Sequence, residues 1–329
     1  MKTIAFFNSK SGIGKTTLVY HLAWMYADLG LNVVVADLDP KANLTSLFLD
    51  EERLEELWLD GAHPQSILGT ISPILEGNGD LTELQLEPIT ENLGLVVGDS
   101  ELFIFESQLS EAWTRCYEGN ELTFRTLSAF YRALFAAFQQ QKADVVLIDV
   151  SPSLSAINTA ALIAAEYVVI PLVQNPLFMY GLNNLGRSLL RLREKWQKCL
   201  NKKSVVDIDL PTAQMQPIGY VILQPHPPTN NTRWVDIPRV YRQSILNDNI
   251  ETPPSVTQDN YCLATLPYYP GLIEMAIQAH KPIFHLKPAD GAMGTYALAV
   301  KDCYKEFKQL AINLAKTCAI DFQKNNFAA

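Results

Sequence analysis

The sequence has few cysteines and histidines, and it has no long run of apolar residues. Its five cysteines are widely spaced and include no C-x-x-C pair, and its five histidines include no H-x-x-x-H pair. We therefore expect neither a zinc site nor a disulfide framework, and a reducing cytoplasm fits this cysteine pattern best. No segment approaches the ~20 apolar residues that a membrane helix needs, so no membrane partner is expected.

The N-terminal segment "MKTIAFFNSKSG" lacks the long apolar region and the cleavage site of a signal peptide. We interpret it as a buried first strand followed by a polar loop.

Charge is distributed unevenly along the chain. Residues 1–150 contain 9 Lys and Arg against 22 Asp and Glu, whereas residues 151–329 contain 17 against 13. The net charge of −9 argues against a protein coated in nucleic acid. A local basic surface on the second half can still bind phosphate groups.

Strand and helix patterns alternate from the start of the chain. Residues 2–7 and 32–37 are short apolar runs, and the second is rich in valine. Between them, residues 16–30 have apolar side chains at a helical period and end at Gly30, a typical helix C-cap. This strand, glycine loop, helix and strand predict a βαβ unit.

The same alternation continues in the second half. Strands are predicted at residues 144–149, 167–172 and 218–223, and helices at 156–165, 182–198 and 297–316. The acidic segment 50–142 has a weaker strand at 93–97 and a helix at 126–141. Because no linker or repeat interrupts the pattern, we predict one α/β domain over residues 1–329, a doubly wound and mostly parallel sheet flanked by helices.

The segment "SGIGKTT" lies between the first strand and the first helix, where a phosphate-binding loop is found. Gly12 and Gly14 would let backbone N–H groups approach an anion, and Lys15 could reach β- and γ-phosphates. The Thr16 hydroxyl is placed to bind Mg²⁺. The strict G-x-x-x-x-G-K-[ST] pattern is not met, because Ser9 holds its first position. The alternative is a glycine turn with a solvated lysine.

Three aspartates end predicted strands. Asp37 and Asp39 are two residues apart in "ADLDPKAN", and Asp149 ends "VVLID", the form of a Walker B strand. In open parallel sheets, ligands bind at the carboxyl ends of the strands. A lone aspartate after a strand can equally be a helix or turn cap.

Several segments together resemble the ParA/MinD ATPases. "KSGIGKTT" is similar to their deviant Walker A motif, which carries an additional lysine, here Lys10. "DLDPKAN", "LIDVSPSLSAINTAAL", "VIPLVQNPLFMYGLNNL" and "LPYYPGLIEMAIQAHKPIF" resemble later family segments, so the resemblance covers nearly the whole chain. The basic amphipathic tail of MinD is missing, and ParA-type partition ATPases are therefore the closer match.

The resemblance implies a P-loop ATPase that uses ATP and Mg²⁺. It also implies a face-to-face homodimer in which Lys10 reaches the partner's phosphates, an electrostatic catalyst supplied in trans. Asp39 would orient the attacking water, Lys15 would bind phosphates, and Thr16, Asp37 and Asp149 would act through the metal ion. The implied nucleotide-binding residues are Lys10, Ser11, Gly12, Ile13, Gly14, Lys15, Thr16, Thr17, Gln224 and Pro267. A solvated Lys10 beside the loop is the alternative.

Two residues depart from the family pattern. Ser11 replaces a glycine, which suggests a strained backbone at this position. Lys41 replaces a glutamine after Asp39 and Pro40, which places a positive charge beside the switch segment. Either departure could slow hydrolysis.

Basic residues concentrate in the second half, around "RSLLRLREKWQKCLNKK" and "RWVDIPRVYRQ". By resemblance these residues would contact DNA phosphates without reading sequence. A solvated helix face is the alternative. The candidate residues are Arg187, Arg191, Arg193, Lys195, Lys198, Arg233, Arg239 and Arg242.

The expected function is an ATP-dependent dimerisation switch that partitions or positions a plasmid, chromosome region or other cargo. A ParB-like or other cargo adaptor would stimulate its slow ATPase, and the ATP-bound form would associate with the nucleoid in the cytoplasm. Alternatives are small-molecule ligation of the amidoligase or dethiobiotin synthetase type, an electron-transfer or metal-carrier ATPase of the NifH or Mrp type, and MinD-like positioning without its own membrane tail.

Overall fold

The computed structural model of the chain describes residues 1–58, 63–173, 176–203, 208–223, 236–246, 260–267 and 269–322, with backbone only at 176–180 and 183. Gln224 and Arg233, two of the predicted site residues, lie outside the described residues.

Eight strands form one sheet in the order β3-β4-β2-β5-β1-β6-β7-β8. Every neighbouring pair is parallel except β3 and β4, which are antiparallel. The predicted mostly parallel α/β sheet is therefore confirmed. The strands are β1 (Thr3–Phe6), β2 (Val33–Asp37), β3 (Glu87–Thr90), β4 (Leu93–Val96), β5 (Val145–Asp149), β6 (Tyr167–Leu172), β7 (Gln216–Leu223) and β8 (Cys262–Leu266).

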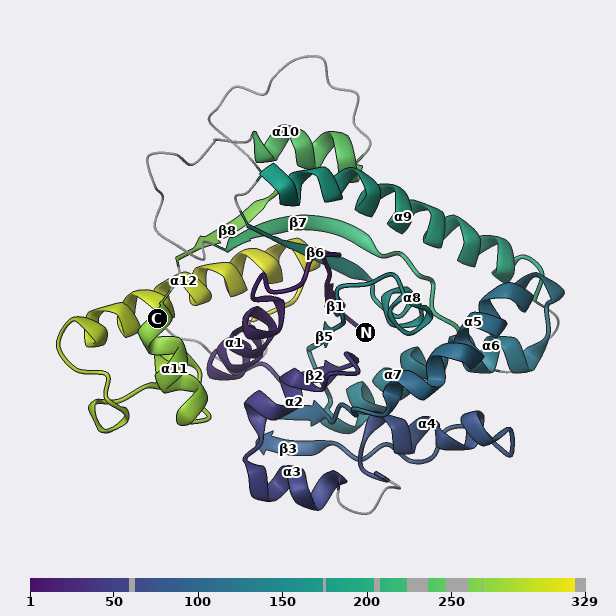
Figure 1. The fold of residues 1–329 in the computed structure, drawn as a ribbon, viewed down its shortest axis with the longest axis horizontal. Helices are drawn as coiled ribbons and strands as arrows, with labels where there is room; N and C mark the ends of the chain where they lie inside the picture. The colour runs from purple at the N-terminus through teal and green to yellow at the C-terminus, as the bar shows by residue number, and fades with distance from the viewer. Residues whose placement is uncertain are drawn as a thin grey trace.

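Helices cover both faces of this sheet (Figure 1). One face carries α1 (Lys15–Asp28), α2 (Asn43–Phe48), α3 (Glu51–Trp58), α11 (Pro270–Gln278) and α12 (Thr295–Cys318). The other carries α4 (Ile67–Glu76), α5 (Phe105–Arg115), α6 (Glu121–Leu127), α7 (Ala129–Gln141), α8 (Ala156–Ile163), α9 (Pro176–Leu200) and α10 (Ile237–Tyr241). The described ranges also contain five short helical turns: η1 (Leu102–Ile104), η2 (Cys116–Glu118), η3 (Arg242–Leu246), η4 (Ile283–His285) and η5 (Pro288–Asp290).

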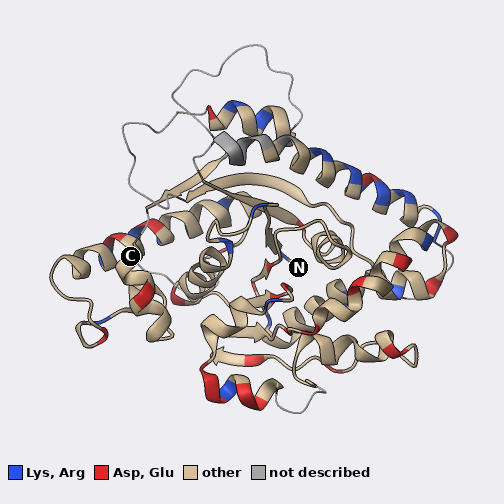
Figure 2. Ribbon diagram, viewed as in Figure 1, with Lys and Arg blue, Asp and Glu red and all other residues tan. Residues whose placement is uncertain are grey.

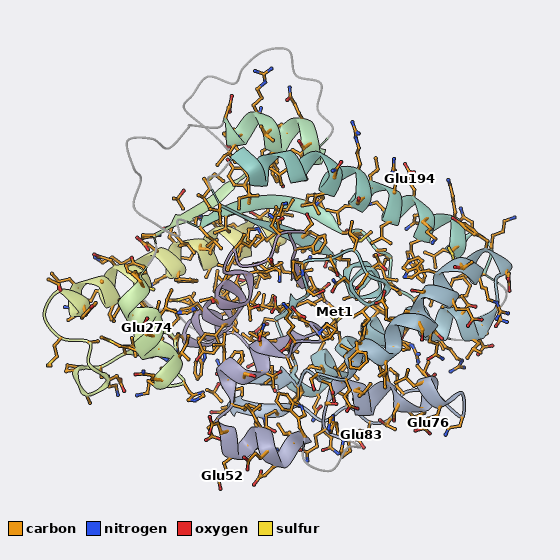
Figure 3. The ribbon with its side chains drawn as sticks, in the orientation of Figure 1. Met1, Glu52, Glu76, Glu83, Glu194 and Glu274 are labelled. Atoms are coloured by element: carbon orange, nitrogen blue, oxygen red, sulfur yellow. A yellow bond between two sulfur atoms is a disulfide. The ribbon has the colours of Figure 1, made fainter. Side chains whose placement is uncertain are left out.

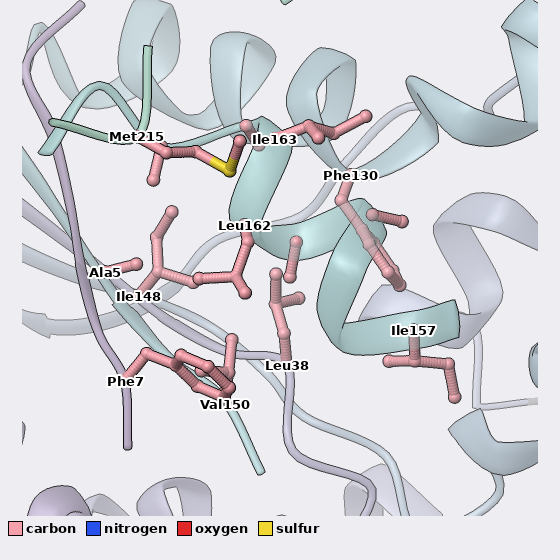
Figure 4. Close-up of a cluster of buried hydrophobic side chains, with 14 of the residues drawn as sticks. Ala5, Phe7, Leu38, Phe130, Ile148, Val150, Ile157, Leu162, Ile163 and Met215 are labelled. Atoms are coloured by element: carbon pink, nitrogen blue, oxygen red, sulfur yellow. The ribbon is translucent and has the colours of Figure 1, made fainter. Parts of the chain in front are cut away.

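Alternate residues of the central strands feed two separate cores. On β1, Ile4 and Phe6 pack toward α1 and α12, whereas Ala5 packs toward α7 and α8. Figure 4 shows the second core, where Ala5 and Ile148 of the sheet lie opposite Leu162 and Met215. The central strands are buried on both sides, which explains their uninterrupted apolar sequences.

The prediction of no disulfide is wrong. Cys116 of η2 and Cys199 of α9 are bonded although they are 83 positions apart in the sequence, and a spacing of this length has no recognisable pattern. Among the described residues, no helix combines the length and apolar composition that crossing a bilayer requires.

Charge also divides the fold. Lys and Arg follow α9 and α10 along one edge, whereas Asp and Glu gather on α3 and on the elements near α4 (Figure 2). Figure 3 labels Glu52, Glu76 and Glu83 on the acidic side and Glu194 on α9. The charge asymmetry of the sequence is thus an asymmetry between two edges of the molecule.

Candidate functional site

The loop between β1 and α1 has the backbone of an anion-binding turn. Gly12 and Gly14 have φ values of 70° and 81°, a conformation that costs glycine little. Gly14 precedes α1, whose first turn has no side-chain cap and no acidic residue. The N–H groups of this turn are therefore available to a bound anion, with the helix dipole behind them.

Ser11 does not have the strain that its departure from glycine suggested. It is absent from the residues with positive φ, so its backbone lies in a region open to any residue. The expectation of a strained Ser11 is wrong.

Lys10 is exposed, and its backbone N–H donates to Asn8 Oδ1 (3.1 Å). Asn8 is anchored in turn, because its Nδ2 donates to the carbonyl of Pro171 (2.8 Å). The Lys10 side chain passes close to α9, where a Cβ placed on Gly181 would lie 3.6 Å from Lys10 Cε. Its backbone is fixed, while its ammonium group has no hydrogen-bond partner among the described residues.

Lys15, Thr16 and Asp149 meet at the carboxyl end of β5. Lys15 Nζ donates to the Val150 carbonyl (2.5 Å) and lies 3.6 Å from Asp149 Oδ1. Thr16 Oγ1 donates to Asp149 Oδ2 (2.7 Å). The structure thus brings together the glycine loop and the aspartate of the Walker B-like strand, which the sequence analysis identified separately.

Asp37 lies beside this group because β2 pairs with β5 in a register that aligns Asp37 with Asp149. Asp37 Oδ2 accepts hydrogen bonds from the backbone N–H (2.8 Å) and hydroxyl (2.9 Å) of Thr45, on α2. Its Oδ1 accepts the N–H of Asp39 (3.3 Å). Asp37 therefore holds the segment that carries Asp39.

Asp39 is buried, and its Oδ1 accepts the backbone N–H of Lys41 (3.0 Å). Its Oδ2 has no hydrogen-bond partner among the described residues. Because Lys41 contributes only its backbone to this contact and its side chain is exposed, the change from glutamine does not alter how Asp39 is held.

The two strand-end carboxyls have raised pKa values. Burial, followed by repulsion from Asp149, raises the pKa of Asp37 to about 7. Burial also raises the pKa of Asp149, although Lys15 opposes this shift. A cation bound here would relieve both effects.

The donor set fits a magnesium ion. Asp149 Oδ1 is buried and has no hydrogen-bond partner in the part of the chain that the structure describes, and the Thr16 hydroxyl donates to the other oxygen of the same carboxylate. Within the described residues, no three His, Cys, Asp or Glu side chains form a closed metal site. A magnesium ion commonly takes one or two protein oxygens and completes its shell with phosphates and waters, so the oxygens of Thr16 and Asp149 are a sufficient protein contribution.

An apolar cavity of about 280 Å³ opens beside the phosphate loop. His21 lies in its wall as a neutral ring, because Nδ1 faces the Thr17 carbonyl (2.8 Å) and Nε2 accepts the Ile283 N–H (3.1 Å). Burial lowers the His21 pKa to about 4. The cavity is of a size and polarity suited to a planar base. Its lining includes Gly12, Ile13, Gly14, Thr17, Leu18, Pro267, Tyr269 and Phe307.

The basic candidates fall into two groups. Arg187, Arg191 and Lys198 of α9 and Arg239 of α10 are exposed. Arg193 instead donates to the Met215 carbonyl (2.8 Å). Lys195 and Arg242 lie over aromatic rings, 5.1 Å from the centre of Trp113 and 5.6 Å from that of Tyr261. Of the five DNA-binding candidates on α9, Arg187, Arg191 and Lys198 are therefore exposed, whereas Arg193 and Lys195 are partly buried.

Sequence reasoning missed the residues that support the site. Thr45, Glu106 and Asn158 hold its loops through hydrogen bonds. Asn158 could have been noticed, since it is a lone amide in the apolar stretch "SAINTAALI". Thr45 and Glu106 have no comparable signal.

Comparison with known proteins gives matches across the chain. The AAA domain family AAA_31 matches residues 1–203. Protein IncC of Escherichia coli is 28% identical over 198 residues, which are 59% of this chain and 47% of IncC. The chromosome-partitioning ATPase Soj of Thermus thermophilus is 32% identical over 194 residues, 59% of this chain and 63% of Soj. The chain thus aligns with about half to under two thirds of these relatives.

A solved structure shares the fold over nearly the full length. The putative plasmid partition protein of Borrelia burgdorferi B31 bound to AMPPNP has a TM-score of 0.59 and 19% identity, and the alignment covers 96% of this chain and 98% of that one. At this identity the match establishes the fold alone.

Proposed function

The chain belongs to the ParA/MinD family of P-loop ATPases, in which its AAA_31 domain places it, and on that premise we propose that it is an ATP-dependent dimerisation switch. In this proposal two protomers enclose two ATP molecules, the dimer binds DNA without reading sequence, and the cycle positions a plasmid, chromosome region or other cargo. The observation that carries the proposal is the meeting of Lys15, Thr16 and Asp149 under a glycine loop, with an exposed Lys10 at its rim.

ATP binding would use groups that are already arranged. The N–H groups at the start of α1 and the Lys15 ammonium would hold the phosphates, and the base would enter the apolar cavity that Pro267 lines. Thr16 and Asp149 would hold Mg²⁺, and Asp37 would act behind them while holding the Asp39 segment. The metal ion would draw charge from the β- and γ-phosphates.

Hydrolysis would depend on two further groups. Asp39 has an oxygen without a partner among the described residues and could accept a hydrogen bond from the attacking water. Lys10 would place its ammonium group against the partner's phosphates, as an arginine finger does. The Lys10 ammonium has no hydrogen bond to the described part of its own protomer. Dimerisation would therefore not have to break a hydrogen bond of Lys10 to these residues.

DNA binding would use the outward charges of α9 and α10. Arg187, Arg191, Lys198 and Arg239 are exposed and could approach phosphates by small side-chain motions. Arg193, Lys195 and Arg242 would contribute to the local potential rather than direct contact. Such binding releases counterions and is therefore strongly salt-dependent.

The partner and location follow from the same proposal. A ParB-like or other cargo adaptor would stimulate the slow ATPase, in a cytoplasm where the ATP dimer associates with the nucleoid. No membrane contact is needed for this cycle.

The deciding experiment is the particle mass by light scattering and the retention of DNA on a filter, each with and without ATP and Mg²⁺. The proposal predicts doubling of the 36.8 kDa mass and DNA retention only with the triphosphate. Asp39→Ala should prolong the dimer. A constant mass together with ATP turnover would instead favour an enzyme of small-molecule ligation.

A further inference from the structure

Asn158 is a polar residue in an otherwise apolar environment. It lies on α8, whose sequence is AINTAALI, and its side chain is completely buried. A buried amide destabilises a fold unless its hydrogen bonds are satisfied. Its contacts therefore indicate what this side chain is needed for.

All side-chain hydrogen bonds of Asn158 go to one loop, residues 150–155. Its Oδ1 accepts the Ser151 N–H (3.2 Å), while Nδ2 lies within hydrogen-bond distance of the carbonyls of Ser151 (3.1 Å) and Ser153 (2.8 Å). Its own N–H donates to Ser155 Oγ (3.2 Å), the N-cap of α8. One amide thus closes the loop from inside.

Glu106 holds the same loop from outside. It lies in the first turn of α5, and its two carboxylate oxygens accept the N–H groups of Ala156 (2.7 Å) and Ile157 (2.9 Å). These are first-turn amides of α8, where a negative charge also suits the helix dipole. The end of the loop is therefore fixed to α5.

The start of this loop is the phosphate site. Asp149 immediately precedes it, and the carbonyl of Val150, its first residue, accepts the Lys15 ammonium (2.5 Å). A loop movement that shifts Val150 would therefore displace the oxygen that orients Lys15 and pull on the backbone of Asp149.

We propose that Asn158 and Glu106 are positioning residues for the Mg²⁺ and phosphate groups, acting through the loop of residues 150–155. The inference rests on the proposed binding of Mg·ATP. It assigns a role in ligand binding to two side chains that touch neither nucleotide nor metal. Groups that orient a metal ligand from behind commonly change affinity or activity by roughly 10- to 100-fold when they are replaced.

The alternative is that both residues only stabilise α8. Asn120 offers a matched control, because it caps α6 by accepting the Leu122 N–H (2.9 Å) away from the phosphate site. Asn120→Ala should lower stability as loss of a helix cap does and leave ligand binding unchanged.

The experiment measures thermal unfolding and the dissociation constants of ATP with Mg²⁺ and with EDTA for Asn158→Leu, Glu106→Gln and Asn120→Ala. For Asn158→Leu we expect the affinity for Mg·ATP to fall about 10- to 100-fold. In EDTA the affinity for ATP should fall less, because Asp149 then binds no metal ion. Glu106→Gln keeps one acceptor oxygen and should have a smaller effect in the same direction. Asn120→Ala should match the wild type in both constants.

Unchanged affinity in folded Asn158→Leu and Glu106→Gln, with wild-type protein that binds Mg·ATP, would overturn this inference and leave the proposed function intact. The inference would also be overturned if Asn158→Leu, Glu106→Gln and Asn120→Ala all lost ATP affinity equally with Mg²⁺ and with EDTA. That result would mean that the substitutions act by general destabilisation. If Asn158→Leu does not fold, the ATP affinities of Glu106→Gln decide whether the inference holds. Absence of Mg·ATP binding by the wild type would overturn the proposed function and this inference together.

Discussion

The phosphate edge of the sheet and the outer face of α9 are built in opposite ways. At the phosphate edge, Lys15, Asp37 and Asp149 are buried and held by hydrogen bonds. On α9, Arg187 and Arg191 are exposed, and no hydrogen bond or ion pair to their side chains occurs among the described residues.

This difference is consistent with the roles proposed for the two regions. Holding a triphosphate and its metal ion requires oxygens and amines at fixed positions, which burial and hydrogen bonding provide. Attraction to a uniformly charged polymer requires only positive charge near the surface, which mobile side chains provide. Lys10 combines features of both regions. It lies at the phosphate edge, but its side chain is exposed like those of Arg187 and Arg191 on α9.

Lys10→Ala should have the largest effect. We expect turnover to fall about 100- to 1000-fold, as for the loss of one transition-state donor, while ATP affinity changes little. Turnover by phosphate release and affinity by fluorescent nucleotide titration are the measurements, with Lys301→Ala on α12 as an exposed-lysine control. Unchanged ATP turnover in Lys10→Ala would mean that Lys10 is a solvated lysine without a role in hydrolysis.

Removing the outward charges of α9 should weaken DNA binding without affecting the phosphate edge. Arg187→Ala, Arg191→Ala and Lys198→Ala together should reduce the slope of log K against log salt by roughly 3, about one for each side chain that no longer meets a phosphate. Filter binding across a salt series measures this. A control of equal charge replaces three exposed lysines of α12, namely Lys301, Lys305 and Lys308. Equal weakening in both triple variants would mean that net charge, not the α9 face, governs binding.

Asp37 should make the phosphate edge sensitive to pH. Its folded-state pKa of about 7 lies above the unfolded value of 3.8, so the folded state binds more protons and loses stability as pH rises between these values. Asp37→Asn should remove this slope and raise stability at pH 8 by about 1–3 kcal/mol. Thermal unfolding at pH 5, 6, 7 and 8 tests this. If the stability of Asp37→Asn falls equally steeply with rising pH, titratable groups other than Asp37 cause the pH dependence.

Ser11→Gly should have the smallest effect. Because Ser11 has no positive φ, glycine relieves no strain and only increases the freedom of the unfolded chain. Stability should fall by about 0.5–1 kcal/mol, and ATP turnover should stay within about two-fold. Denaturant unfolding and turnover are the measurements. A marked rise in turnover would show that the serine restrains the loop.

The sequence was most informative where periodicity and burial agree. Residues 167–172 coincide with β6, and the other predicted strands match within two residues, because strands buried on both faces are continuous apolar runs. β3 and β8 were not predicted. β3 is a half-buried antiparallel edge strand, and β8 is an edge strand that is only partly buried, so neither has the continuous apolar sequence of the central strands.

The site was predictable to the extent that its chemistry is local in sequence. Gly12, Gly14, Lys15 and Thr16 are consecutive or nearly so, and their arrangement follows from one turn. The hold of Glu106 on α8 and the Cys116–Cys199 bond join residues 50 and 83 positions apart, and no single segment contains their pattern. Arg193 and Lys195 show the same limit, because a helical period places them on α9 but does not reveal their contacts with Met215 and Trp113.

The exposed basic residues of α9 form a row of defined length along the helix axis. Arg187, Arg191 and Lys198 are 4 and 7 residues apart, so they share one side of the helix and extend over about 17 Å of its axis. Duplex DNA rises about 3.4 Å per base pair, so this row matches a footprint of roughly five base pairs. In the proposed dimer, two such rows aligned by a two-fold axis would occupy about one turn of the double helix, so an oligonucleotide of about ten base pairs would be the shortest expected to saturate it.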